Sequence, residues 1–127
     1  MLDYPVLDLS TDPYLKPSPK GALSPRLSRL FDRSYTSDRE AAKDPLISPV
    51  FAAPEELRSF PPTLMISASQ DSLAAEEAVF KNELESAGVA VTYRLFEGVK
   101  HGFTLIKGPA TDEAWGMMID HLRRNLN

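Results

Sequence analysis

Asp71 and His101 are the two residues of this sequence whose types and positions best fit catalysis. They lie far apart in the chain, and each follows a segment expected to form a strand. A carboxylate that accepts a hydrogen bond from imidazole Nδ1 fixes the tautomer of the ring and leaves Nε2 free to move a proton. Such a pair could serve as the orienting acid and the general base of a reaction that uses a nucleophile.

Position alone leaves simpler roles open for both residues. An Asp between a strand and a helix is often only a cap, and a His beside a glycine is often only a turn residue. A metal site is not expected, because His101 and His121 lie on different elements and no carboxylate is spaced to join them as a ligand. We expect no cofactor.

The segment that places Asp71 is predicted to be a buried strand ending in an acidic turn. Residues 64–66 form an apolar run without alternation, which is typical of a parallel strand covered on both faces. Ser72 is expected to cap the helix that follows, with Glu76 and Glu77 in its first turn. Catalytic groups often lie beyond the carboxyl ends of strands in open α/β sheets, so Asp71 is well placed for chemistry.

His101 is predicted to lie in a loop that follows a helix and a second strand. Apolar residues between 73 and 87 fall on one helical face, and Gly88 is expected to end that helix. Residues 89–96 alternate like a strand, and residues 97–102 are expected to form the loop after it. A helix between two strands predicts a parallel crossover. Asp71 and His101 should therefore meet at one sheet edge, with the imidazole donating to the carboxylate.

A last helix is expected after Thr111, which is predicted to cap it. Acidic residues in its first turn and basic residues in its last turn suit the helix dipole. Its predicted buried stripe consists of Trp115, Met118, Ile119, Leu122 and Leu126.

The segment before Thr63 is irregular, since it contains all but one of the prolines. Residues 2–9 fit the last part of a strand or an edge strand, because proline cannot donate to a ladder. Residues 11–25 are expected to form a surface loop, and apolar residues between 23 and 35 recur at helical spacing. Short helical turns are expected at residues 39–43 and 55–58. The chain thus divides near residue 61.

Composition excludes several classes of protein. The chain has 127 residues, and 43% of them are hydrophobic, as is typical of one globular domain. The net charge is -4 and the 14 Lys and Arg residues are scattered, so neither nucleic acid nor a membrane is an expected partner. The chain contains no cysteine, and no segment is typical of a signal peptide or a transmembrane helix. We expect a cytoplasmic protein.

Several motifs in order resemble the hormone-sensitive-lipase-like esterase family of α/β-hydrolases, specifically its carboxyl-terminal part. They include Pro-Pro-Thr-Leu-Met-Ile, Asp-Ser-Leu and His-Gly-Phe, and an upstream Ser-Pro motif. The matching segments are residues 4–8, 47–52, 61–66, 71–73, 84–89 and 101–103. Ala68 stands where the family commonly has glycine. The resemblance covers nearly the whole chain.

This resemblance implies an α/β fold, namely a partial α/β-hydrolase with a small parallel sheet flanked by helices. Residues 1–60 would form a Pro-rich, cap-like segment, and residues 61–127 a strand-helix-strand-helix unit. The implied reaction is hydrolysis of a carboxylic ester through an acyl-serine, with Asp71 as the triad acid and His101 as the triad base. The residues that could line an ester pocket, with ordinary packing as the alternative, are Tyr14, Leu15, Phe31, Tyr35 and Phe103.

The departure from the family is the missing nucleophile. No serine lies in a G-x-S-x-G motif, and the His-Gly-Gly oxyanion loop is absent from the sequence. We therefore expect the chain alone to be inactive, with a small ester as substrate only if an amino-terminal half completes the fold. The alternative is a non-catalytic remnant or interaction module. An exposed sheet edge or face, with apolar surface around Leu2, Val6, Leu7 and Leu64, should lead the chain to self-associate, most simply as a two-fold dimer.

Overall fold

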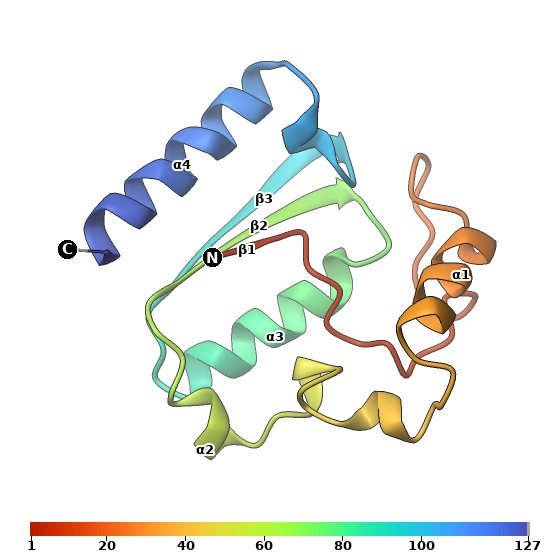
Figure 1. The fold of residues 1–127 in the computed structure, drawn as a ribbon. Coiled ribbons are helices and arrows are strands. Elements are labelled where there is room, and N and C mark those ends of the chain that lie inside the picture. The colour runs from red at the N-terminus through yellow and green to blue at the C-terminus, as the bar shows by residue number, and fades with distance from the viewer. Residues whose placement is uncertain (127) are drawn as a thin grey trace.

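The computed structural model describes residues 1–126, and its centre is a parallel sheet in the order β1-β2-β3 (Figure 1). The strands are β1 (Leu2–Asp3), β2 (Thr63–Gln70) and β3 (Val91–Lys100). The α-helices are α1 (Pro25–Tyr35), α2 (Pro54–Leu57), α3 (Ala74–Ser86) and α4 (Pro109–Asn125), and single 3₁₀ turns occur at Ala41–Lys43, Pro49–Phe51 and Phe103–Leu105. The predicted α/β class is confirmed.

Strand β2 forms the core because both of its faces are covered. Leu64, Ile66 and Ala68 pack on the side of α4, whereas Met65 packs with the α3 residues Phe80 and Leu84 on the other side. Figure 1 shows α3 and α4 on opposite faces of the sheet. The unbroken apolar run at residues 64–66 thus reflects burial on two sides, as predicted.

The β2-α3-β3 unit has the predicted parallel pairing, although its second strand is longer than expected. Helix α3 is followed by Gly88, whose φ of 89° is the left-handed conformation that glycine adopts most easily. Strand β3 continues to Lys100, so the expected loop at residues 97–102 was wrong over most of its length. The register between β2 and β3 shifts near Ser69, and this irregularity allows Lys100 to pair with Gln70.

Two predicted helix caps were also wrong. Helix α3 begins after Leu73 rather than Ser72, and the Leu73 N–H donates instead to Oδ1 of Asp71 at 3.2 Å. Helix α4 begins at Pro109, since proline suits the first helical position. Thr111 therefore lies inside the first turn, where its hydroxyl donates to the carbonyl of Phe103 at 2.9 Å.

Two amphipathic helices bury much less than their sequences indicate. On α4 only Ala114 and Met118 are buried. The other members of its predicted stripe are exposed, namely Trp115, Ile119, Leu122 and Leu126. No residue of α1 is buried. Apolar periodicity marks the face of a helix that can pack. A sheet of only three strands, however, covers little of the apolar face of α1 or of α4.

The Pro-rich first half folds back over one face of the sheet. Leu2 pairs with Met65, and Leu7 is buried against the α3 side of the core. Leu64 is buried too, on the α4 side of the sheet, so the expectation of open surface around Leu7 and Leu64 was wrong, whereas Val6 is exposed. Within residues 1–126, no helix is long and apolar enough to cross a membrane.

Candidate active site

Asp71 and His101 meet at the carboxyl edge of the sheet, as their positions after β2 and β3 predict. His101 Nδ1 lies 2.6 Å from Asp71 Oδ2, so the expected hydrogen bond is present. Asp71 is only 3% exposed, and its other oxygen accepts the Leu73 N–H. Both carboxylate oxygens are thus held, which fixes the orientation of the imidazole that they support.

The environment of His101 favours its charged form. The hydrogen bond to Asp71 raises the pKa of His101, and partial burial of the ring opposes that shift. The side chain of His101 is 31% exposed, so the ring that the carboxylate supports remains partly open to solvent. The arrangement can accept a proton and stabilise the imidazolium that results.

Tyr4 is a contact of His101 that the sequence did not reveal. The two rings lie 4.6 Å apart between centroids. The Tyr4 hydroxyl is hydrogen-bonded to the Thr104 hydroxyl, which in turn donates to Asp3 Oδ2 at 2.9 Å. Tyr4 has a φ of 35°, an uncommon value for a residue other than glycine, and such strain is often found at functional sites. No local sequence signal marks this contact, because Tyr4 lies at the opposite end of the chain from its partners.

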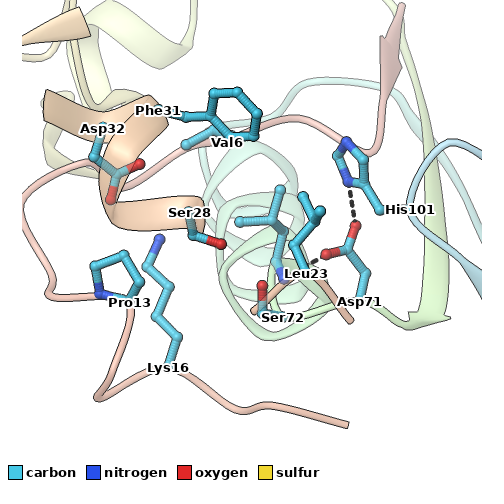
Figure 2. Close-up of a pocket in the computed structure, with 11 residues that line it drawn as sticks. Val6, Pro13, Lys16, Leu23, Ser28, Phe31, Asp32, Asp71, Ser72 and His101 are labelled. Carbon is cyan, nitrogen blue, oxygen red and sulfur yellow. Dashed lines mark hydrogen bonds and ion pairs between the residues drawn. The ribbon is translucent and has the colours of Figure 1, made fainter. Parts of the chain in front are cut away.

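A pocket of about 200 Å³ opens beside the pair (Figure 2). Asp71 and His101 lie on one side of it, and Lys16, Asp32 and Pro13 lie on the other. The remaining lining residues are Val6, Leu23, Ser28, Phe31, Ser72 and Leu73. The pocket is therefore built from the Pro-rich half, α1 and the turn that precedes α3.

Of the five pocket residues proposed from the sequence, Phe31 lines this pocket. Tyr14 lies under the guanidinium of Arg29, whose Cζ is 4.4 Å from the ring centroid. Leu15 and Tyr35 are exposed to solvent. Phe103 is buried in the core against Phe96, with 5.1 Å between ring centroids. Aromatic and aliphatic type alone did not separate pocket residues from core or surface residues.

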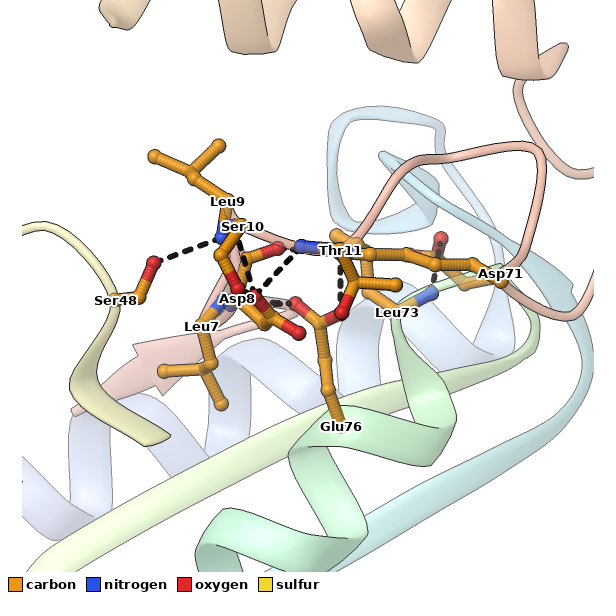
Figure 3. A network of polar contacts seen from close by, with 10 residues as sticks. Leu7, Asp8, Leu9, Ser10, Thr11, Ser48, Asp71, Leu73 and Glu76 are labelled. Atoms are coloured by element: carbon orange, nitrogen blue, oxygen red, sulfur yellow. Dashed lines mark hydrogen bonds and ion pairs between the residues drawn. The ribbon is translucent and has the colours of Figure 1, made fainter. Parts of the chain in front are cut away.

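The far wall of the pocket is held by a salt bridge between distant parts of the chain. Glu76 accepts backbone N–H groups from Leu7 at 2.8 Å and Asp8 at 3.2 Å (Figure 3). Its second oxygen lies 2.5 Å from Lys16 Nζ, which also donates to the carbonyl of Asp8 at 2.6 Å. Both charged side chains are at least nine-tenths buried. These contacts fix residues 7–16 over the start of α3.

A second buried carboxyl lies behind the Asp71–His101 pair. Glu77 is 0% exposed, and neither of its oxygens has a hydrogen-bond partner within residues 1–126. Burial is the main reason that the pKa of Glu77 is raised to about 8; the nearby charges of Asp71 and Glu76 act in the same direction, whereas the Ser67 hydroxyl opposes the shift. The carboxyl is consequently neutral at pH 7. Sequence reasoning missed its burial.

Serines near the pair differ in what their side chains contact. Ser67 is buried, and the Ser69 hydroxyl accepts the N–H of Gly98 at 2.9 Å. Ser72 lines the pocket. None of the three lies in a G-x-S-x-G motif. Among residues 1–126 no group of three or more metal-ligating side chains gathers in one place.

A parallel sheet with helices on both faces, and an Asp–His pair at its carboxyl edge, are features of the α/β-hydrolase fold. A family model described as alpha/beta hydrolase fold matches residues 1–105, and the chain belongs to this family. Within the family, the chain is similar to one part of proteins that include hormone-sensitive lipase.

Individual relatives agree with this assignment. The chain is 27% identical over 130 residues to a protein of Acanthamoeba polyphaga mimivirus named as an alpha/beta hydrolase, covering 98% of this chain and 38% of that protein. It is 28% identical over 87 residues to hormone-sensitive lipase of Bos taurus, covering 67% of this chain and 12% of the lipase. The crystal structure of carboxyl esterase 2 from the fungus Tuber melanosporum superimposes with a TM-score of 0.88 at 26% identity, covering 99% of this chain and 44% of the esterase. The chain thus spans less than half the length of these relatives.

Proposed function

We propose that this chain carries the acid–base pair of a carboxylic ester hydrolase of the esterase or lipase type. The observation that carries the proposal is the 2.6 Å contact between His101 Nδ1 and Asp71 Oδ2 at the edge of a pocket. In this role His101 takes the proton of a serine nucleophile and later gives it to the leaving alcohol. Asp71 orients the ring and stabilises the imidazolium. The esterases and lipases among the relatives support the same class of reaction.

The serine itself comes from a further polypeptide segment in this proposal. The chain has no G-x-S-x-G motif, and its relatives are more than twice as long. Strand β1 is the first strand of the sheet and has no neighbour on its outer side within residues 1–126. A further parallel strand added at this edge would bring its own carboxyl end beside Asp71 and His101. That position suits a nucleophile and the donors of an oxyanion hole.

The test is to complete the fold. An amino-terminal segment that carries a G-x-S-x-G motif, taken from an esterase of this family, is fused before Met1, and hydrolysis of p-nitrophenyl butyrate is measured. We expect turnover that falls by at least about 10³-fold in His101→Ala and in a variant without the motif's serine. A folded fusion whose turnover is the same with and without His101 would contradict the proposed role.

The chain without the added segment provides the matched control. We expect it to hydrolyse p-nitrophenyl butyrate no faster than its own His101→Ala variant, because oxyanion donors and a nucleophile supply most of the barrier lowering. A clearly faster rate in the unsubstituted chain would show that Ser72 or water activated by His101 acts as the nucleophile.

A second candidate is a non-catalytic interaction module. It is favoured by α1, which buries none of its residues and exposes Leu30, Phe31 and Tyr35. For such a module the fused protein would remain inactive, and a surface variant such as Leu30→Ser would weaken binding of a different partner protein while Asp71→Asn would not. The esterase proposal expects the opposite result for the fused protein.

A further inference from the structure

The pocket beside Asp71 and His101 has two ends of different chemistry. Near the pair the walls are apolar, formed by Val6, Leu23, Phe31 and Leu73. At the other side lie Lys16, Ser28 and Asp32 (Figure 2). A volume of about 200 Å³ is small beside the roughly 300 to 1,000 Å³ of most ligand pockets. The space therefore suits a short chain that crosses an apolar stretch and ends among polar groups.

The polar end is dominated by hydrogen-bond acceptors. The Asp32 carboxylate accepts no hydrogen bond from residues 1–126, although it lines the pocket from α1. Ser28, one helical turn earlier, donates its hydroxyl to the Ser24 carbonyl at 3.4 Å, which leaves the Ser28 oxygen able to accept. Both acceptors belong to the same face of α1, because they are four residues apart. A ligand group that donates hydrogen bonds would satisfy them.

Lys16 does not reverse this preference for a hydrogen-bond donor, because its ammonium is already paired with the carboxylate of Glu76. Its ammonium donates to Glu76 at 2.5 Å and to the Asp8 carbonyl at 2.6 Å. The salt bridge with Glu76 neutralises it, so Asp32 remains as the uncompensated charge at this end. Partial burial raises the pKa of Asp32 and Lys16 opposes that shift, as expected for a carboxylate near but not bonded to an ammonium. The other charged groups that act on Asp32 are Asp8, Asp12 and Arg39.

We infer that this pocket selects esters whose short apolar chain ends in a hydrogen-bond donor, with an ammonium end bound better than a methyl or a carboxylate end. The inference rests on the proposed esterase function, since it names the substrate class of the same site. Asp32 is the residue that determines this specificity, through a charge-assisted hydrogen bond with the end of the chain.

The experiment measures binding to the 127-residue chain rather than turnover. Three acetate esters with the same four-methylene spacer are compared at pH 6, namely 4-aminobutyl acetate, pentyl acetate and 5-acetoxypentanoate. Dissociation constants come from the chemical shifts of the backbone amides of His101 and Asp32 during titration. We expect 4-aminobutyl acetate to bind about tenfold more tightly than pentyl acetate, and 5-acetoxypentanoate to bind most weakly.

Two variants separate Asp32 from general charge effects. Asp32→Asn is expected to reduce the preference for the ammonium end to about twofold or less. Asp112→Asn removes the same charge from an exposed site on α4 and should leave the preference unchanged. Should Asp32→Asn fail to fold, the unsubstituted chain still tests whether charge sets the preference, because about 0.5 M NaCl should weaken binding of the ammonium ester and spare pentyl acetate.

A second set of ligands distinguishes the two parts of an ester that could enter the pocket. Methyl 6-aminohexanoate and methyl heptanoate place the same two ends on the acyl side. A preference for the ammonium end in either set supports the inference. The set that shows it identifies whether the alcohol part or the acyl part of the ester enters the pocket. Equal affinities within both sets, a preference that survives Asp32→Asn, or no binding at millimolar concentration overturns it. Absence of hydrolysis by the fused protein counts against the proposed function alone, since binding is measured without chemistry.

Discussion

Lys16 and Glu76 form a salt bridge of 2.5 Å that joins the Pro-rich first half of the chain to the start of α3. The two residues are 60 positions apart, and both side chains are at least nine-tenths buried. Glu76 also holds the N–H groups of Leu7 and Asp8 (Figure 3). This contact therefore keeps the far wall of the pocket in place.

Replacing Lys16 should destabilise the fold. In Lys16→Met the Glu76 carboxylate loses its counter-charge while staying buried, and removing one partner of such a pair costs about 3 kcal/mol. Urea unfolding measures the change. Lys81→Met is the matched control, since the Lys81–Glu85 pair is more exposed and surface pairs of this kind contribute little. Equal effects of the two substitutions would contradict the structural role of Lys16.

The pKa of His101 should depend on Asp71. The hydrogen bond to Asp71 is the main cause that raises this pKa, so Asp71→Asn should move the titration of His101 to lower pH. The stabilisation from this pair is complete below the unfolded-state pKa of His and is lost as pH rises through the folded-state pKa. NMR titration of the imidazole measures the shift. His121 on α4 is the internal control and should titrate as before.

Glu77 should make the chain less stable as pH rises. Its pKa is about 8 in the fold and near 4.5 unfolded, so the folded state holds a proton that the unfolded state releases between these values. Over that range the free energy of unfolding should fall by on the order of 5 kcal/mol, at about 1.4 kcal/mol for each unit of pKa.

Glu77→Gln should flatten this dependence and stabilise the chain at pH 8, because the amide cannot ionise. Urea unfolding between pH 5 and pH 8.5 measures both effects. Glu85→Gln on the same helix changes an exposed carboxyl and should leave the slope in place. A flat profile in the unsubstituted chain would show that the Glu77 carboxyl reaches water.

The chain should self-associate at micromolar concentration. Strand β1 leaves its outer edge unpaired within residues 1–126, and α1 exposes Leu30, Phe31 and Tyr35. Soluble proteins rarely leave such apolar surface open, and a two-fold dimer is the simplest way to cover it. Sedimentation velocity over a range of concentrations measures the association.

Substitutions on the exposed face of α1 provide the control for that prediction. Leu30→Ser with Tyr35→Ser should weaken association without loss of stability, because neither side chain is buried. A monomer at every concentration would favour a self-sufficient module over a chain that needs a further segment.

The sequence by itself determined the elements that carry the candidate pair. Strand β2, helix α3 with Gly88 after it, and strand β3 follow from apolar patterns and turn residues that act over a few positions. Parallel strands joined by one helix then bring Asp71 and His101 to the same edge, so their contact could be predicted from connectivity.

Only the tertiary structure decided what surrounds that pair. Tyr4 against His101, Lys16 against Glu76, and the burial of Glu77 depend on contacts between distant residues or on packing of the whole sheet. The same holds for α1 and α4, whose apolar stripes are mostly exposed although their periodicity is that of packed helices. A local pattern shows which face of an element can be buried. Whether a partner covers that face depends on the three-dimensional arrangement of the entire chain, which carries no local signal.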